Sequence, residues 1–241
     1  MTGCPCLEYN SPFNICVYNN HMSVSIIVPT FNRAKFSKLI SLNISSQDYP
    51  LIKEIVIADD GDDQERLSLD VPYTVLYYRV GRMSIGDKRN FLITKCEGEY
   101  IANMDTDDFY SPSFLSSSIF NLIKSGKNIS GSSDMLMMDT TTEKKYRQRC
   151  LYLDMLNEAT MVFRRSFGIS HKFSNSNSSE GIAFLTGSLN EIYETPIDDI
   201  MVCLAHEKNT VSKSAWLCDK YETALDMTRY SLHLILSKGI V

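Results

Sequence analysis

Short apolar segments that end in polar or acidic residues alternate with segments of helical periodicity through the first half of the chain. Residues 24–28 are rich in Val and Ile and stop at Pro29, which lacks a backbone donor, so they predict a buried strand. Residues 35–46 repeat apolar side chains at helical spacing and predict a helix. The same criteria predict strands at residues 54–58, 74–79 and 100–104 and helices at residues 87–96 and 112–125. This alternation predicts an α/β fold, with a mostly parallel sheet flanked by helices.

The second half of the chain is less regular. It predicts strands at residues 134–139, 159–164 and 201–205, a polar loop at residues 174–179 and a closing amphipathic helix at residues 221–236. Residues 1–22 show no periodicity and are expected to form an irregular leader. A length of 241 residues, 44% of them hydrophobic, favours one domain over residues 23–241, with halves that meet near residue 128.

Charge and cysteine content narrow the possible surroundings and partners. The net charge of −5 is the wrong sign for a broad nucleic-acid surface, so no nucleic-acid partner is expected. Seven irregularly spaced cysteines favour a reducing compartment over a disulfide framework. The chain has no apolar run of about 18 residues that would suit a transmembrane helix. These features predict a soluble, cytoplasmic protein without a transmembrane segment.

Acidic side chains follow two of the predicted strands. Asp59 and Asp60 end one strand, and Asp105, Asp107 and Asp108 follow another. Because the carboxyl ends of parallel strands meet at one edge of a sheet, these carboxylates are expected to border one crevice. Carboxylates gathered in this way repel one another unless a cation or hydrogen-bond donors offset the repulsion, and Mg²⁺ or Mn²⁺ is a suitable partner. The alternative is a pair of solvated turns in which Asp bonds the local backbone.

Two cations stand near the start of the helix predicted at residues 87–96. Lys88 and Arg89 would lie close to the same crevice, together with the free backbone N–H groups of the first helical turn. Cations and free N–H groups both favour phosphate binding. The alternative is a basic helix start that pairs with neighbouring acids.

Four sequence blocks in one order resemble the family 2 glycosyltransferases, whose nucleotide-binding fold is called GT-A. The blocks are residues 25–33, 54–61, 88–90 and 98–108, and the match extends from residue 23 to about residue 112. The resemblance implies an inverting transfer from a UDP-sugar donor to a hydroxyl-bearing acceptor such as a glycan, assisted by Mn²⁺ or Mg²⁺. It also implies a nucleotide-sugar half at residues 23–128 and an acceptor half at residues 129–241.

The resemblance also implies roles for individual residues. Asp105 and Asp107 match the DxD motif of the family, in which the first carboxylate faces the ribose or the metal and the second binds the metal. His206 matches a late histidine that can complete the metal shell. Asp60 would recognise the base, with Asp59 beside it. The other residues expected to bind the donor are Pro29, Thr30, Arg33, Lys88, Arg89 and Thr106.

The expected catalytic residue is Glu180. Many members of the family have a Glu-Asp pair at this point, and the aspartate often serves as the base. Here Gly181 takes the place of that aspartate, which makes Glu180 the candidate general base. If Glu180 does not serve, Asp154, Glu158 and Asp134 are the next candidates.

Three other functions are compatible with some of these sequence features. A nucleotidyltransferase that makes sugar nucleotides would need a glycine-rich loop after the first strand, and residues 29–32 contain no glycine. A phosphorelay receiver would be about half as long, with its acids after other strands. A sugar-nucleotide-binding module without catalysis would carry the same motifs as a transferase.

Overall fold

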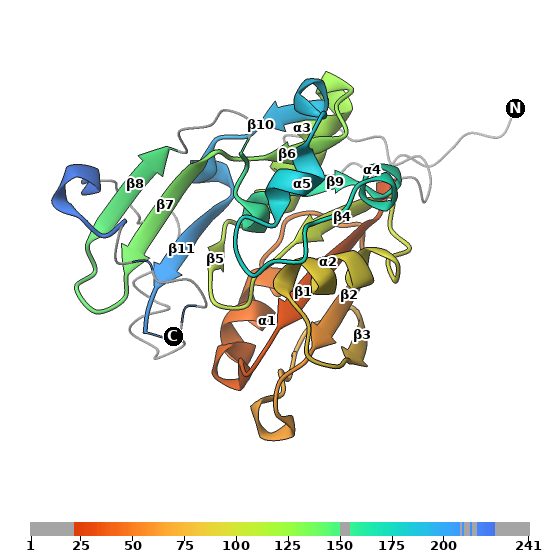
Figure 1. The fold of residues 1–241 in the computed structure, drawn as a ribbon, viewed down its shortest axis with the longest axis horizontal. Coiled ribbons are helices and arrows are strands. Elements are labelled where there is room, and N and C mark those ends of the chain that lie inside the picture. Colours follow the sequence, from red (N-terminus) through yellow and green to blue (C-terminus); the bar gives the residue numbers. More distant parts are fainter. Residues whose placement is uncertain (1–21, 150–154, 208, 210–212, 214–215, 225–241) are drawn as a thin grey trace, which may run out of the picture.

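The structure is a computed structural model that describes residues 22–149, 155–207, 209, 213 and 216–224. Its centre is a sheet of seven strands in the order β10-β6-β9-β4-β1-β2-β3 (Figure 1). β4, β1, β2 and β3 run parallel, whereas β9 is antiparallel to both of its neighbours. The strands are β1 (Val24–Thr30), β2 (Ile52–Asp59), β3 (Thr74–Arg79), β4 (Tyr100–Asn103), β6 (Ile129–Gly131), β9 (Val162–Arg164) and β10 (Ile192–Glu194). The sequence prediction of a mostly parallel sheet is confirmed.

Helices cover both faces of this sheet because its inner strands are apolar on both sides. On β1, Ile26 and Ile27 are completely buried in two different hydrophobic clusters, one on each face. Residues of α1 (Ser37–Ser45) and α3 (Phe114–Ser125) belong to the first cluster. Residues of α2 (Ile85–Ile93), α4 (Arg165–Ser170) and α5 (Gly181–Leu185) belong to the second.

A second sheet lies beside the first and brings the two halves of the chain together (Figure 1). Its strand order is β5 (Phe109–Tyr110), β11 (Met201–Ala205), β7 (Asp134–Asp139) and β8 (Lys145–Arg149). The buried Asp108, next to β5, accepts a hydrogen bond of 3.0 Å from the amide of Leu204 in β11. The acidic segment at residues 105–108 therefore passes from the central sheet to the second sheet.

The predicted elements agree with the structure best where the apolar pattern is strongest. Strands at residues 74–79, 134–139 and 201–205 have the predicted bounds. The helix predicted at residues 87–96 instead begins at Ile85 and ends at Ile93, because Ser84 caps it by accepting a hydrogen bond of 3.1 Å from the Asp87 amide. The strand predicted at residues 159–164 is shorter, since a 3₁₀ turn occupies Glu158–Thr160.

Short elements escaped the sequence prediction. The strands β5, β6, β8 and β10 and the helices α4 and α5 were not predicted. The closing helix predicted from residue 221 does not begin there, because Asp219–Tyr221 is a 3₁₀ turn and Glu222 bridges to Tyr146. Residues 225–236 of that prediction, and residues 1–21 of the predicted leader, lie outside the described residues. In the described part of the chain, no helix combines the length and apolarity needed to cross a membrane.

Candidate functional site

Two adjoining cavities lie at the carboxyl ends of the central strands. The larger has a volume of about 520 Å³ and the smaller about 110 Å³. Asp105 and Asp107 line both, so the two predicted motif carboxylates stand where the cavities meet. Glu158 and Glu180 line the larger cavity only. The crevice expected beyond the strand ends is therefore present, and residues from the second half of the chain form much of its wall.

Most of the predicted donor-binding residues line the smaller cavity. They are Pro29, Thr30, Arg33, Lys88, Asp105 and Thr106. Lys88 is buried, and its Nζ donates to the Thr30 carbonyl at 3.0 Å and lies 2.6 Å from Asp60 Oδ1. Burial lowers the pKa of Lys88, while the hydrogen bond and charge of Asp60 act in the opposite direction. Lys88 therefore ties β1 to the end of β2 at the back of the cavity.

Asp59 and Asp60 do not line either cavity. Asp59 is buried, with Arg79 Nη1 2.7 Å from one carboxylate oxygen and the Gly61 amide 2.9 Å from the other. The side chain of Asp60 is fully buried between Lys88, Arg82 and the backbone amide of residue 83. Asp59 makes the local turn bond that the alternative interpretation anticipated, but both carboxylates are buried in ion pairs and are not solvated.

The start of α2 is occupied by a loop from the second half of the chain. The Ile85 amide donates to Asn177 Oδ1 at 3.0 Å, and the Gly86 amide donates to the Ser176 carbonyl at 3.1 Å. A Cβ atom at Gly86 would lie 1.9 Å from the Ser174 carbonyl oxygen, so this close contact requires glycine. The sequence interpretation of free N–H groups for phosphate is therefore wrong, because the loop at residues 174–179 uses them.

Asp107, which lines both cavities, contacts His206, which lines neither. His206 Nε2 lies 3.3 Å from Asp107 Oδ2, and Arg33 Nη2 lies 3.4 Å from the same oxygen. Burial acts to raise the pKa of Asp107, but the hydrogen bond with His206 and the charge of Arg33 lower it overall. Asp108 differs, because burial and the charge of Asp107 raise its pKa to about 7. The two neighbouring carboxyl groups are thus shifted in opposite directions, with the pKa of Asp107 lowered and that of Asp108 raised.

The Asp107 and His206 pair suits two adjacent positions around a small divalent cation. Ligands about 2.1 Å from an octahedral ion lie roughly 3 Å apart, close to the spacing found here. Among the described residues, no three His, Cys, Asp or Glu side chains form a metal-binding group by themselves. A cation held by two protein ligands would take its other ligands from water and from a bound phosphate.

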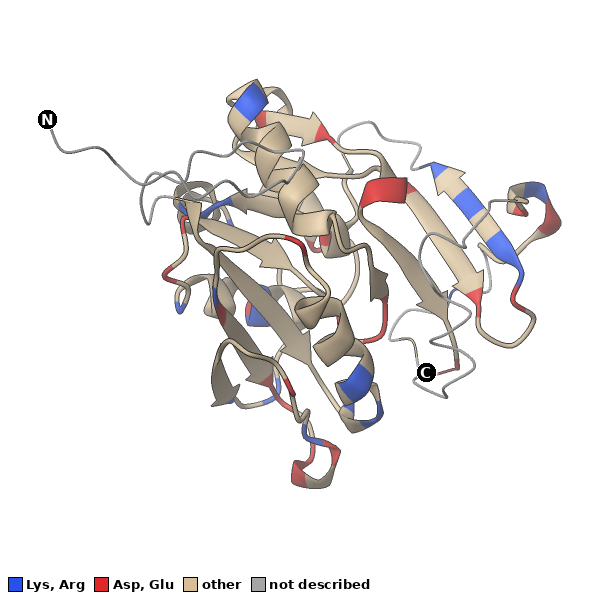
Figure 2. Cartoon of the chain, turned by 180° about the vertical axis from the view of Figure 1, so that it is seen from behind, with Lys and Arg blue, Asp and Glu red and all other residues tan. Residues whose placement is uncertain are grey.

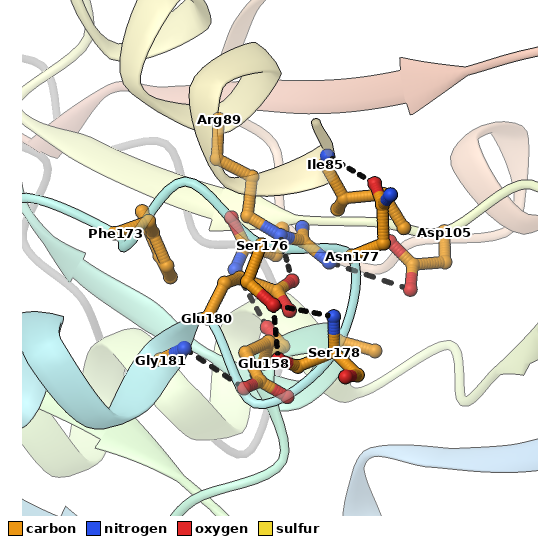
Figure 3. Close-up of polar contacts among 12 residues, drawn as sticks. Ile85, Arg89, Asp105, Glu158, Phe173, Ser176, Asn177, Ser178, Glu180 and Gly181 are labelled. Carbon is orange, nitrogen blue, oxygen red and sulfur yellow. Dashed lines mark hydrogen bonds and ion pairs between the residues drawn. The ribbon is translucent and has the colours of Figure 1, made fainter. Parts of the chain in front are cut away.

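Arg89 contacts two other acids on the wall of the larger cavity, Asp105 and Glu180 (Figure 3). Its side chain is 2% exposed, with Nη2 3.0 Å from Asp105 Oδ1 and Nε 3.2 Å from Glu180 Oε1. Nη1 is buried and has no hydrogen-bond partner in the described part of the chain. The charges of Asp105 and Glu180 raise the pKa of Arg89 despite its burial. Arg89 therefore positions Asp105 and Glu180, and it also lines the larger cavity.

Glu158 is a site residue that sequence analysis ranked only as a reserve. Its Oε1 accepts a hydrogen bond of 2.9 Å from the Gly181 amide, which places it beside Glu180 (Figure 3). Burial and the negative charge of Glu180 raise the pKa of Glu158. Little in the sequence pointed to this residue, because 23 positions separate it from Gly181 and only the fold brings the two together.

The charge pattern away from the cavities is mixed. Figure 2 shows Lys and Arg dispersed among Asp and Glu, with one basic run along β8. Two arginines of that run are paired, since Arg147 contacts Asp134 at 3.0 Å and Arg149 contacts Glu194 at 3.1 Å. Asp134, a reserve candidate for the base, is thus engaged with Arg147, and Asp154 lies outside the described residues.

Comparison with known proteins identifies related sequences. The family model described as Glycosyl transferase family 2 matches residues 25–179. A Rickettsia conorii protein described as an uncharacterized glycosyltransferase is 31% identical over 106 residues, which cover 43% of this chain and 17% of the relative. The poly(ribitol-phosphate) beta-N-acetylglucosaminyltransferase TarS of Staphylococcus aureus is 29% identical over 101 residues, covering 39% and 18% respectively. The matches thus span less than a fifth of either relative.

Solved structures show the same fold. The crystal structure of residues 1–349 of S. aureus TarS matches with a TM-score of 0.58 and 18% identity, over 76% of this chain and 61% of that one. A mannosyltransferase from Pyrobaculum calidifontis matches with a TM-score of 0.55 and 15% identity, over 83% and 62% of the two chains. The arrangement of strands and helices is therefore that of the GT-A fold.

Proposed function

The chain belongs to glycosyl transferase family 2, and from that premise we propose that it transfers a sugar from a UDP-sugar to the hydroxyl group of an acceptor, assisted by Mn²⁺ or Mg²⁺. One observation carries the proposal. Asp105 and Asp107 stand between a small cavity and a large one, so a molecule in each would meet at these carboxylates. That arrangement suits a reaction between a donor and an acceptor.

We propose that the nucleotide part of the donor occupies the smaller cavity. Arg33 supplies a positive charge on its wall, close to Asp107 at the junction. Arg82 and Phe31 line the same cavity, with the guanidinium carbon 3.6 Å from the ring centroid, and offer flat surfaces against which a base can stack. Pro29, Thr30, Lys88 and Thr106 complete the wall, while Asp59 and Asp60 act indirectly by fixing its shape.

Asp107, where the two cavities meet, and His206 beside it fit a divalent cation. Asp107 and His206 would hold it, with Asp105 on the side of the donor. When bound, such a cation stabilises the negative charge that develops on a departing diphosphate. The protein's own contribution is to keep Asp107 ionised through His206 and Arg33, and to fix Asp105 through Arg89.

We propose that the acceptor enters the larger cavity, which the half of the chain at residues 129–241 largely encloses. An acceptor hydroxyl there would approach the sugar carbon from the face opposite the departing nucleotide, so the transfer would invert that carbon. Two glutamates on this wall, Glu180 and Glu158, are the candidates to take the proton of the hydroxyl, and Glu180 is the one that is paired with Arg89.

Solved relatives support a nucleotide-sugar donor and a metal, although they differ in the nucleotide. TarS of S. aureus has been crystallised with UDP-GlcNAc and with UDP, and the P. calidifontis mannosyltransferase with GDP-Man and Mn²⁺. We propose UDP for this chain from the resemblance of its sequence blocks. The free thiols of Cys96, Cys203 and Cys218 are consistent with our proposal of a reducing, cytoplasmic location.

A thermal-unfolding panel tests the donor and the metal. UDP-glucose, UDP-galactose, UDP-GlcNAc and GDP-mannose are each compared with and without Mn²⁺. The correct donor at one hundred times its Kd should stabilise the protein by about 2.7 kcal/mol in the presence of the metal. Asp107→Asn should lose that metal-dependent stabilisation. Asp63→Asn, at a side chain that is 88% exposed, should retain it. The proposal fails if no nucleotide sugar in the panel stabilises the wild-type protein.

Binding without catalysis is the second candidate function. The proposed site departs from the family at Gly181, and Glu180 is already paired with Arg89, so the sequence-predicted base is not free. Release of UDP from the bound donor distinguishes the two functions. A transferase releases UDP through slow transfer to water, whereas a binding module leaves the donor intact.

A further inference from the structure

The Glu158 side chain occupies the space where any side chain at position 181 would have to lie. A Cβ atom built on Gly181 would be 2.8 Å from Glu158 Cγ and 2.9 Å from Glu158 Oε1. Real Cβ atoms do not approach other atoms that closely. Glycine at position 181 is thus linked to the position of Glu158 by direct contact.

The backbone of Gly181 does not itself demand glycine. In the described part of the chain the glycines with positive φ are Gly126 and Gly187, and Gly181 is not among them. Gly181 is the first residue of α5, a conformation that other residues adopt readily. The observed requirement is therefore for space, and the Glu158 side chain fills that space, with the Met161 methyl group 3.1 Å away.

Glu158 and Glu180 differ in how their charges are compensated. Glu180 is buried, and its Oε1 lies 3.2 Å from Arg89 Nε. The described residues give Glu158 no ion pair, and it accepts a hydrogen bond from the neutral Gly181 amide instead. Of the two glutamates on the wall of the larger cavity, Glu158 is consequently the one less committed to holding the structure together.

The surroundings of Glu158 also suit proton transfer. It lines the larger cavity together with Asp105 and Asp107, but unlike them it does not line the smaller one. The charged groups that act on it are Glu180, from the residue before α5, and Arg89, from α2. Burial and Glu180 outweigh Arg89, so the pKa of Glu158 is raised above the usual glutamate value. A carboxylate with a raised pKa is a stronger base.

We propose that Glu158 is the residue that takes the proton from the acceptor hydroxyl, and that Gly181 is present because it leaves room for this carboxyl. This inference rests on the proposed transferase function. The acceptor oxygen forms a bond to the sugar carbon while its proton passes to the Glu158 carboxylate. The bond from that carbon to the phosphate oxygen breaks, and its electron pair leaves with UDP. Glu180 and Arg89 are positioning residues in this arrangement.

The test uses water as the acceptor and measures UDP released from UDP-glucose, UDP-galactose and UDP-GlcNAc with Mn²⁺. Glu158→Gln should lower the turnover of the wild-type reaction by about 10²–10⁴-fold. The KM for the donor should stay within about threefold, because the residue lies away from the smaller cavity. The acidic limb of the wild-type rate profile, located above the usual glutamate range, should disappear.

A relocated carboxylate separates a chemical role from a structural one. In Glu158→Ala/Gly181→Asp the truncation vacates the space beside position 181, and the new aspartate returns a carboxyl to it. Glu158→Ala/Gly181→Ala is the matched control, with the same truncation and no acid. The aspartate variant should release UDP at least tenfold faster than the control. This pair also decides the question if Glu158→Gln fails to fold.

The outcomes distinguish this inference from the function on which it rests. If the wild-type protein releases UDP, and Glu158→Gln keeps a turnover within threefold of it, Glu158 is not the base and the transferase proposal stands. Equal rates in the two double variants would overturn the inference in the same way. If the wild-type protein neither binds nor consumes any of the three donors, the transferase proposal fails and the inference fails with it.

Discussion

The acids near the two cavities have their charges compensated in different ways. Behind the smaller cavity, Asp60 pairs with Lys88 and Arg82, and Asp107, on the wall of both cavities, contacts Arg33 and His206. On the wall of the larger cavity, Glu158 and Glu180 lie together with Arg89 as the cation beside them, and Asp105 also draws on that arginine. Each acid of the first group therefore has an arginine or lysine of its own, whereas the three acids of the second group share Arg89.

The difference suits two different tasks. Paired carboxylates stay ionised and hold their positions, which a binding surface for a nucleotide and a cation requires. Acids that share one cation repel each other, and the repulsion makes one of them hold a proton more tightly. Burial first, and then the negative charge of Glu180, raise the pKa of Glu158 in this way. The paired acids near the smaller cavity therefore maintain the shape of its wall, whereas Glu158 on the larger cavity can exchange a proton.

Removing the shared cation should give the largest effect on stability. Arg89→Met leaves Glu180 buried without its ion-pair partner, so the free energy of unfolding should fall by about 3–5 kcal/mol. Urea denaturation measures the change. Arg149→Met is the control, because that arginine is 56% exposed and its pair with Glu194 should contribute about 0–1 kcal/mol. Similar losses in the two variants would show that the crowded wall has no special need for Arg89.

Neutralising Glu158 should have a smaller effect that depends on pH. Because its pKa is raised in the folded protein, the folded state keeps this proton at pH values where the unfolded chain has released it. The free energy of unfolding of the wild-type protein should therefore fall, relative to Glu158→Gln, as the pH rises from the usual glutamate pKa through the raised one. Below that interval the difference between the two proteins should not change with pH.

Urea denaturation of both proteins between pH 4 and pH 8 measures this difference, and Glu222→Gln provides a comparison at a carboxyl that is 40% exposed and paired with Lys144. A constant difference between wild type and Glu158→Gln across the whole range would contradict the picture of an uncompensated acid on the larger cavity wall.

The exposed rim of the smaller cavity should give the smallest effect. Arg82 lies over the ring of Phe31, but its side chain is 64% exposed, so the contact should be worth about 0.5–1 kcal/mol. A double-mutant cycle with Phe31→Leu and Arg82→Met isolates it from the pairing of Arg82 with Asp60. A coupling energy above about 2 kcal/mol would show that this rim is as tightly constrained as the buried pair of Asp60 and Lys88.

The longer strands were predicted well from the sequence. Strands such as β3 and β7 have the predicted bounds, because their apolar patterns are local and continuous. The two-residue β5 and the three-residue β6 and β10 were missed, since so few residues carry no periodicity. These strands exist because neighbouring strands supply their hydrogen-bond partners, and such information is not local.

The expected positions of the acids agree with the structure in the same uneven manner. Asp105 and Asp107 follow an apolar strand and line the cavities beyond its carboxyl end, and His206 lies beside Asp107. Asp59 and Asp60 carried the same signal but are buried in ion pairs away from the cavity walls. Sequence position cannot separate these cases, because the cations that engage them come from β3 and α2.

The sequence by itself determined the order of strands and helices, the fold class and the strand ends at which chemistry would be found. These follow from side-chain hydrophobicity, backbone preferences and short motifs, all of which act over a few residues. Only the tertiary structure decided which acids are paired and which are not, and that Glu158 fills the space left by Gly181. Charge compensation and steric contact depend on distances between residues far apart in the chain, and folding alone sets those distances.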